Sequence, residues 1–192
     1  MTASSAHFFI SGKVMTNKAI LLWFTGLSGA GKSTLSNSVN EQLRLDGIHT
    51  MLLDGDILRK GLCKDLQFSQ ADRAENIRRA GEVSKLFLDA GVVTLAAFMS
   101  PMEKDRELVK ELVGADRFIE IYCKCSFEIC ESRDVKGLYK KARTGELKHF
   151  VGLDDPYQEP VNPTLEIDTG KLSIDASIAL IIDFLKAKKV LC

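Results

Sequence analysis

The residues with the clearest chemistry form a short run, which reads G-L-S-G-A-G-K-S from Gly26 to Ser33. The glycines let the backbone turn with its N–H groups pointing inward, and such a phosphate-binding loop (P-loop) holds the phosphates of a nucleotide. Lys32 is expected to reach the β- and γ-phosphates, and the hydroxyl of Ser33 to ligate Mg²⁺. We therefore predict that ATP binds to a loop made of Gly26, Leu27, Ser28, Gly29, Ala30, Gly31, Lys32, Ser33 and Thr34.

The segments on both sides of this loop have the patterns that a P-loop needs. An apolar run from Ala19 to Phe24 precedes it and is expected to be a buried strand. A helix is expected to begin at Lys32, with Leu35, Val39 and Leu43 on one face. The free N–H groups at its start would add positive charge beside the phosphates. The alternative is a plain glycine-rich turn between a strand and a helix.

The rest of the chain alternates short apolar runs with helical periodicity, which predicts one α/β domain over residues 19–192. We expect a three-layer, P-loop NTPase-type domain with a parallel five-stranded sheet and helices on both faces. The strands are predicted at 19–24, 49–53, 92–98, 118–122 and 164–167. The main helices are predicted at 32–45, 69–91, 103–113 and 173–186. A basic, proline-containing stretch is predicted to be a mobile lid at residues 134–163.

Composition limits the partners and the location of the protein. The 26 Lys and Arg residues balance 26 Asp and Glu residues, so no net charge draws the chain to nucleic acid or to a membrane. No apolar stretch is long enough to span a bilayer, and the start of the chain lacks the pattern of a secretory signal. We expect a cytoplasmic protein with a flexible tail at residues 1–18. The five cysteines form no CxxC pair, so we expect reduced thiols rather than a zinc site.

Polar residues follow the predicted second and third strands. Asp54 and Asp56 come after the second strand and Ser100 follows the third. Ligands gather outside the carboxyl ends of parallel strands, so these residues are expected to lie beside the P-loop. Phosphoryl transfer needs a metal ligand and an acceptor for the proton of the nucleophile. We assign Asp56 to base or metal contact in preference to a helix cap, and Asp54 to a metal or structural role.

The segment from Phe68 to Arg79 reads F-S-Q-A-D-R-A-E-N-I-R-R and places Arg73 and Asn76 early in a helix. Arginine forks bind phosphate-like groups, and an aromatic ring can stack on a base. The arrangement would suit an anionic aromatic substrate, although a solvated helix surface explains the same residues.

The motifs together resemble adenylylsulfate kinase, over nearly the whole chain from Leu21 to the last helix. They read G-L-S-G-A-G-K-S, L-D-G-D-I-L-R-K-G-L, F-S-x-x-D-R-x-E-N-I-R-R, F-M-S-P, R-D-V-K-G-L-Y-K-K-A-R-T-G-E-L and F-V-G-L-D-D-P-Y. The resemblance implies transfer of the γ-phosphate of MgATP to the 3′-hydroxyl of adenosine 5′-phosphosulfate. The products would be 3′-phosphoadenylyl sulfate and ADP, in sulfate activation. It also implies a homodimer and a stand-alone kinase.

The resemblance also implies roles for individual residues. Asp56 would sit at the 3′-hydroxyl as the catalytic group, together with Lys32 of the P-loop. The phosphosulfate and ribose would be held by Arg59, Arg73 and Asn76, and the adenine by Phe68 and Phe150. Met99 and Ser100 would contact the substrate, and a phosphoserine at this Ser is assigned in bacterial members. Lys136 and Arg143 would close over the nucleotides, and Ser33, Asp54 and Asp56 would serve the metal.

Two departures from the family pattern lie near the predicted substrate pocket. Met102-Glu103 replaces an aromatic residue or His followed by Arg, and Tyr157-Gln158 replaces Tyr-Glu. Two other functions fit part of the pattern. A P-loop kinase for another small hydroxyl acceptor would share the first motif and the lid. A catalytically inactive nucleotide-binding regulatory subunit would bind ATP without releasing ADP.

Overall fold

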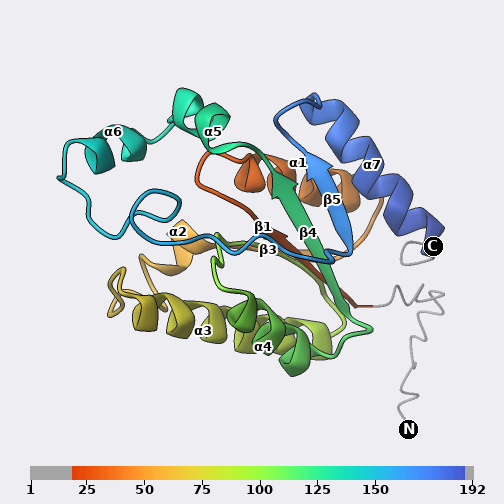
Figure 1. Cartoon of the computed structure of the whole chain (residues 1–192). Coiled ribbons are helices and arrows are strands. Elements are labelled where there is room, and N and C mark those ends of the chain that lie inside the picture. Colours follow the sequence, from red (N-terminus) through yellow and green to blue (C-terminus); the bar gives the residue numbers. More distant parts are fainter. Residues whose placement is uncertain (1–18, 189–192) are drawn as a thin grey trace, which may run out of the picture.

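Five parallel strands form the central sheet, in the order β2-β3-β1-β4-β5 (Figure 1). The computed structural model describes residues 19–188, and the predicted tail at residues 1–18 lies outside them. Strand β1 lies at the centre, so the chain extends the sheet to one side through β3 and β2 and to the other through β4 and β5. The strand bounds are β1 Leu21–Thr25, β2 Thr50–Asp54, β3 Val93–Ala97, β4 Phe118–Lys124 and β5 Leu165–Asp168.

Helices cover both faces of the sheet, which confirms the predicted three-layer α/β fold (Figure 1). One face carries α3 (Gln70–Asp89) and α4 (Glu103–Val113), and the other carries α1 (Lys32–Leu45) and α7 (Ile174–Ala187). A single turn, α2 (Gly55–Leu58), follows β2 directly. Two short helices, α5 (Phe127–Arg133) and α6 (Leu138–Arg143), form the first part of the long segment between β4 and β5.

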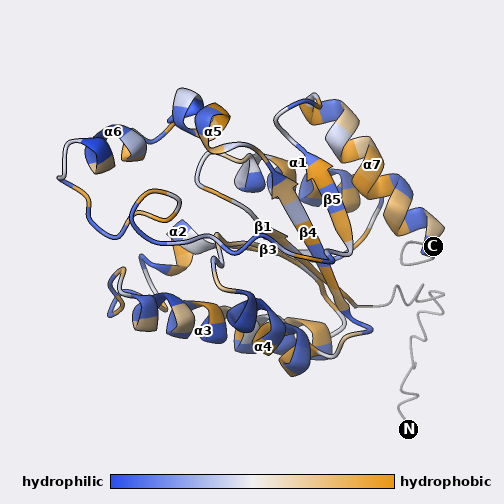
Figure 2. Cartoon of the chain, in the orientation of Figure 1, coloured by the Kyte–Doolittle hydropathy of each residue, from blue (hydrophilic) through white to orange (hydrophobic). Residues whose placement is uncertain are grey.

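The central strand is buried on both faces, as expected for a parallel sheet between helix layers. Leu22 and Phe24 pack into the core under α1 and α7, whereas Leu21 and Trp23 pack into the core under α3 and α4. Apolar residues accordingly gather in the strands and on the inner sides of these helices (Figure 2). The double burial fixes the end of β1, and therefore the start of the P-loop.

Most predicted elements agree with the structure to within a residue or two. The helix at 103–113 is observed as predicted, and Ser69 caps α3 by accepting a hydrogen bond from the N–H of Asp72. The long helix ends at Asp89 rather than at Gly91, because Gly91 adopts a φ of 79° that a helix does not allow. The helical periodicity of residues 173–186 predicts that Ile174 faces the core with Ile178, Ile181, Ile182 and Leu185, and for Ile174 this prediction is wrong. Ile174 is 52% exposed at the start of α7.

The predicted lid at residues 134–163 contains α6 and an isolated bridge between Val151 and Asp155. Lysines and arginines make α6 largely hydrophilic (Figure 2). No part of the described chain forms a helix long and apolar enough to cross a membrane. The described cysteines Cys63, Cys123, Cys125 and Cys130 are buried free thiols, as predicted, and Cys192 lies outside the described residues.

Candidate active site

A cavity of about 1000 Å³ opens at the carboxyl ends of the central strands. It brings together most of the residues that the sequence singled out, from the P-loop, the acidic turn, α3, the end of β3 and the predicted lid. The predicted site residues that line it are Ser28, Gly29, Gly31, Lys32, Ser33, Thr34, Asp54, Asp56, Arg59, Phe68, Arg73, Asn76, Met99, Ser100, Lys136 and Phe150.

The glycines at the start of the P-loop are required by space as well as by backbone angle. Gly26 has a φ of 148°, and a Cβ atom there would lie 2.6 Å from the carbonyl oxygen of Cys123. Gly29 has a φ of 78°, and its Cβ would lie 2.9 Å from the carbonyl oxygen of Cys130. A side chain at either position would displace backbone of β4 or α5, so the loop can approach this closely only as glycine.

Side chains hold the carbonyl groups of the P-loop in a consecutive series. The carbonyl of Leu27 accepts a hydrogen bond from Lys32 Nζ at 2.7 Å, and that of Ser28 from the Tyr139 hydroxyl at 2.8 Å. The carbonyl of Gly29 accepts from Arg133 at 3.3 Å, and that of Ala30 from Thr169 Oγ1 at 2.9 Å. We call these four contacts the carbonyl clamp. The N–H of Ala30 also donates to the carbonyl of Leu27, at 3.1 Å. With the carbonyls held in this way, the other N–H groups of the loop can bind phosphate oxygens.

Helix α1 begins directly behind the loop without a side-chain cap. Gly31 is its N-cap residue, in a left-handed conformation. The first N–H groups of the helix therefore have no capping side chain and are available to an anion. Lys32 lies in this first turn, and partial burial of its ammonium group lowers its pKa from 10.5 to about 8. An anionic ligand at this position would restore the usual preference for the charged form.

The two acidic residues at the end of β2, Asp54 and Asp56, have different surroundings. The carboxylate of Asp54 accepts a hydrogen bond from the Ser33 hydroxyl at 2.9 Å and another from the N–H of Asp56 at 2.8 Å. Asp54 is thus the N-cap of α2, and the cap that was weighed for Asp56 belongs to Asp54. Asp56 is exposed in the first turn of α2, and its carboxylate forms an ion pair with Lys136 of the predicted lid.

The candidate metal position is the pair formed by Ser33 and Asp54. The described residues hold no group of three or more His, Cys, Asp or Glu side chains that could bind a metal by itself. A hydroxyl and a carboxylate 2.9 Å apart beside the P-loop provide the oxygen donors that Mg²⁺ takes when phosphates supply further ligands. The donor set therefore fits a magnesium ion that arrives with a nucleotide.

An aromatic ring with two guanidinium groups close to it forms a second part of the cavity wall. The ring of Phe68 is half-exposed, with Arg59 at 4.5 Å and Arg73 at 5.5 Å from its centroid. Arg73 also donates hydrogen bonds to the carbonyls of Phe68 and His149, both at 2.9 Å. Arg73 therefore ties this wall to the segment that carries Phe150.

Asn76 supplies a buried donor at the cavity. Its residue is 4% exposed, and its Nδ2 atom has no hydrogen-bond partner among the described residues. Because an unsatisfied buried amide destabilises a protein, such a group in a cavity wall indicates a position for a ligand acceptor. Phe150 is almost fully buried and packs its ring edge-to-face on Tyr139 at 4.8 Å.

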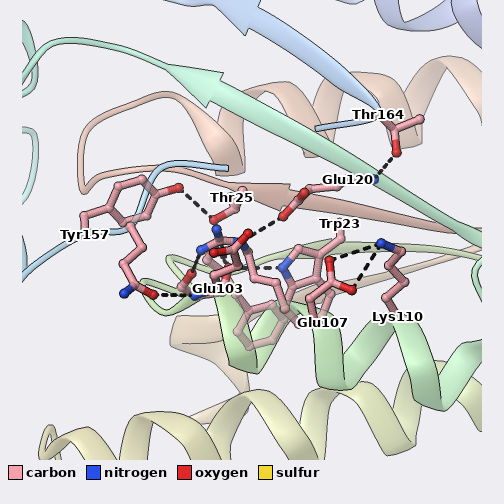
Figure 3. A network of polar contacts seen from close by, with 12 residues as sticks. Trp23, Thr25, Glu103, Glu107, Lys110, Glu120, Tyr157 and Thr164 are labelled. Atoms are coloured by element: carbon pink, nitrogen blue, oxygen red, sulfur yellow. Dashed lines mark hydrogen bonds and ion pairs between the residues drawn. The ribbon is translucent and has the colours of Figure 1, made fainter. Parts of the chain in front are cut away.

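Ser100 lies at the end of β3 in a buried polar network with Trp23 and Thr25. Figure 3 shows Trp23, Thr25 and Tyr157 of this network. Its hydroxyl accepts a hydrogen bond from Trp23 Nε1 at 3.1 Å and donates to Thr25 Oγ1 at 2.9 Å. The Thr25 hydroxyl also contacts the Tyr157 hydroxyl at 2.9 Å. Ser100 is 1% exposed, and no carboxylate or imidazole of the described residues bonds to its hydroxyl. The hydroxyl has no adjacent base to activate it as a nucleophile.

Arg143 is the one predicted nucleotide-binding side chain of the lid that the structure does not bring to the cavity. Its guanidinium group binds Glu131 at 2.8 Å and lies 5.7 Å from the centroid of the Phe127 ring. Gly26, Leu27 and Ala30 belong to the P-loop but do not line the cavity. Their predicted contacts with ATP stay predictions, as does that of Arg143.

Sequence reasoning missed several residues around the ATP side of the cavity. Arg133 lines it and donates hydrogen bonds to the carbonyls of Gly29 and Thr169. Tyr139 and Leu172 line it as well. Arg133 and Tyr139 belong to the same R-D-V-K-G-L-Y motif as Lys136, so their motif was a signal for a site. Nothing in the local pattern marked Leu172.

The fold and the site define a P-loop kinase. A nucleotide-binding loop, a hydroxyl–carboxylate pair for a metal and a separate basic, aromatic wall meet in one cavity beneath a basic segment. The sequence profile described as Adenylylsulphate kinase matches residues 18–168. The chain belongs to the adenylylsulphate kinase family, whose members are ATP-dependent kinases.

Individual relatives agree with this assignment. The chain is 57% identical over 166 residues to the adenylyl-sulfate kinase of Prochlorococcus marinus, which covers 86% of the chain and 83% of the relative. It is 56% identical to that of Oceanobacillus iheyensis, covering 90% and 87%. The structure of the Mycobacterium tuberculosis APS kinase CysC in complex with AMPPNP and APS is similar with a TM-score of 0.84 and 45% identity. The match covers 88% of this chain and 98% of that one.

Proposed function

We propose that this protein transfers the γ-phosphate of MgATP to the 3′-hydroxyl of adenosine 5′-phosphosulfate, giving 3′-phosphoadenylyl sulfate and ADP. The observation that carries the proposal is the single cavity that contains both the P-loop and the wall of Phe68, Arg59, Arg73 and Asn76. The first side fits the phosphates of ATP. The second fits a nucleotide with an anionic tail, because it offers an aromatic ring, two guanidinium groups and a free amide donor.

On the ATP side, the P-loop N–H groups and the start of α1 bind the β- and γ-phosphates. Lys32 leaves the carbonyl of Leu27, which it holds in the present structure, and moves its ammonium group to the phosphates. Ser33 and Asp54 would hold the magnesium ion, which supplies charge neutralisation on the phosphates when it is bound. Two observations support these roles: the chemistry of the side chains, and the carbonyl clamp that fixes the loop.

On the acceptor side, Asp56 is the candidate general base. The 3′-oxygen bonds to the γ-phosphorus, the bond between this phosphorus and the β-phosphate oxygen breaks, and the hydroxyl proton passes to the carboxylate of Asp56. In the present structure this carboxylate is paired with Lys136. We propose that Lys136 exchanges Asp56 for the phosphate groups when both nucleotides are bound, as the lid at residues 134–163 closes.

We propose that the phosphoryl group passes directly to the acceptor without a phosphoserine at Ser100. The Ser100 hydroxyl is buried and hydrogen-bonded to Trp23 and Thr25. Among the described residues, no carboxylate or imidazole forms a hydrogen bond with it. In-line transfer to a bound hydroxyl needs positioning and charge stabilisation rather than a covalent stop. Met99 and Ser100 then serve as part of the wall that contacts the acceptor.

The setting of the enzyme completes the proposal. We place it in the cytoplasm, because its described cysteines are unpaired thiols and a reducing compartment keeps them so. We propose a homodimer, which sedimentation of the purified protein would test. A hexameric APS kinase is known from Thiobacillus denitrificans, and this chain covers 31% of it at 30% identity.

The test is a reaction of the purified protein with MgATP and adenosine 5′-phosphosulfate, followed by chromatography of both products. We expect 3′-phosphoadenylyl sulfate and ADP in equal amounts. ADP formation with another acceptor from a panel of small alcohols, but not with the sulfonucleotide, would favour a different kinase. ATP binding without ADP release under any condition would favour a regulatory subunit.

A further inference from the structure

The turn after β3 has a strained backbone that other residues must hold. Ser100 has a φ of 39°, in the left-handed region that a residue with a side chain rarely adopts, and it is buried. Met99, Ser100 and Pro101 line the cavity, and we call these three residues the acceptor loop. A strained conformation persists only where its surroundings determine it.

Arg106 of α4 holds this turn from outside the cavity. Its Nη1 atom donates a hydrogen bond to the carbonyl oxygen of Ser100 at 2.8 Å. Its Nε atom lies 2.8 Å from Glu120 Oε1 on β4, and its side chain is 2% exposed. Figure 3 shows Glu120 on this strand, facing the same network as Trp23 and Thr25. Arg106 does not line the cavity, so it does not contact a substrate there.

Burying this ion pair costs free energy, so a contribution to stability does not by itself explain why Arg106 and Glu120 are charged. The guanidinium and the carboxylate both lose water, and well-packed apolar residues commonly replace such pairs without loss of stability. Arginine offers something that an apolar residue cannot, because its planar fork donates in two fixed directions. Here Nη1 donates a hydrogen bond to the Ser100 carbonyl, whereas Nε is paired with Glu120 by charge at 2.8 Å without the geometry of a hydrogen bond.

A further contact joins the acceptor loop to the end of the predicted lid. The N–H of Gln158 donates to the carbonyl of Pro101 at 2.8 Å, and its side-chain Oε1 accepts from the N–H of Glu103 at 2.9 Å. This bond caps α4, whose N-cap residue Met102 makes no side-chain cap of its own. The helix that carries Arg106 is thereby fixed relative to the loop that Arg106 binds.

We propose that Arg106 is a positioning residue for the acceptor nucleotide: through the Ser100 carbonyl it sets the conformation of the acceptor loop. The inference rests on the proposed function, since it concerns how the site receives adenosine 5′-phosphosulfate. The proposal predicts an effect on the acceptor side and none on the ATP side, because Arg106 forms none of the four contacts of the carbonyl clamp. Loss of Arg106 should therefore weaken acceptor binding selectively.

The first variant is Arg106→Met, assayed for steady-state kinetics with each substrate varied in turn. We expect the KM for adenosine 5′-phosphosulfate to rise by about tenfold or more, because a charge-assisted hydrogen bond to the loop is lost. The KM for ATP should stay within about twofold of the wild type. This variant leaves Glu120 buried without its partner, so a lower Tm is also expected.

A matched set separates positioning from stability. Arg106→Met/Glu120→Leu removes both charges, so it should regain much of the lost Tm while keeping the raised acceptor KM. Glu120→Gln keeps the donor to Ser100 and should keep an acceptor KM near that of the wild type. Arg106→Lys retains the charge but lacks the fork, so its acceptor KM should lie between those of the wild type and Arg106→Met.

Two outcomes would overturn the proposal. A double variant that regains both Tm and wild-type acceptor KM would show that Arg106 serves stability alone. An equal rise in both KM values for Arg106→Met and the double variant would show a general loosening of the site. The proposed function has its own readout, because wild-type protein that forms no 3′-phosphoadenylyl sulfate would refute it. In that case, calorimetric titration of the same variants with adenosine 5′-phosphosulfate would still test whether Arg106 positions the acceptor loop for binding.

Discussion

Lys32 should make ATP binding depend on pH in a range where lysines with an ordinary pKa stay fully protonated. In the free protein, partial burial lowers its pKa from 10.5 to about 8. Bound phosphates favour the ammonium form and raise the pKa again. The protonated form is the one that binds, so affinity is full well below pH 8 and falls as the pH rises through this value in the free protein.

The size of the effect follows from the charged fraction of Lys32. With a pKa of about 8, the fraction falls from about three-quarters at about pH 7.5 to about 3% at about pH 9.5. The Kd for MgATP should therefore rise about twentyfold over this interval. Near pH 8, each bound ATP should bring the uptake of about half a proton.

Isothermal titration calorimetry measures both quantities. The Kd is followed across the pH range, and titrations in two buffers of different ionisation enthalpy give the proton uptake. Lys32→Arg is the matched control, because arginine stays charged throughout the range and its uptake reports only the other groups. A wild-type Kd that is constant across the range, or a proton uptake equal to that of Lys32→Arg, would refute the reasoning.

Three further predictions concern single side chains of the site. Asp56→Asn should lower kcat by about 100-fold or more with folding intact, since a general base is lost, and a nearly normal kcat would end that role. Phe68→Ala should raise the KM for the sulfonucleotide by about tenfold and that for ATP far less, whereas equal changes in steady-state kinetics would contradict the stacking assignment. Tyr139→Phe removes the donor to the Ser28 carbonyl and should weaken ATP binding by about fivefold in calorimetry; an unchanged Kd would show that this part of the clamp is dispensable.

The sequence predicted those parts of the fold that depend on local pattern. Buried strands show as apolar runs, and Ser69 marks the start of the helix that it caps. The short helices α2 and α6 escaped prediction, because single turns and six-residue helices depend on tertiary contacts more than on pattern. Ile174 is exposed because it lies in the first turn of α7, where it lines the cavity instead of the core.

The candidate site was predictable as a set of residues, but its division of labour was not. The sequence does not distinguish the partners of Asp54 and Asp56. Only the structure shows that Asp54 accepts a hydrogen bond from Ser33 and that Asp56 forms an ion pair with Lys136 of the lid. Arg143 is paired with Glu131 in this structure, and its predicted contact with the nucleotide stays a prediction. Such choices depend on side-chain partners far apart in the sequence, which no single motif contains.

The two departures from the family pattern prove to be neighbours. The side-chain oxygen of Gln158 accepts a hydrogen bond from the backbone N–H of Glu103, so the two positions are in contact. A carboxylate at 158 would lie beside the acidic first turn of α4, which contains Glu103 and Asp105. The neutral amide of Gln158 caps the helix without placing a further negative charge beside these two carboxylates.

The carbonyl clamp has a consequence for engineering. Its donors come from the loop itself, from the turn after β5 and from both Arg133 and Tyr139, which flank the start of the predicted lid. The lid is therefore not a detachable module. A chimera that takes residues 134–163 from a distant kinase would leave the carbonyl of Ser28 without the Tyr139 donor. It would lose nucleotide affinity even when its own catalytic residues are intact, unless the recipient loop is exchanged with it.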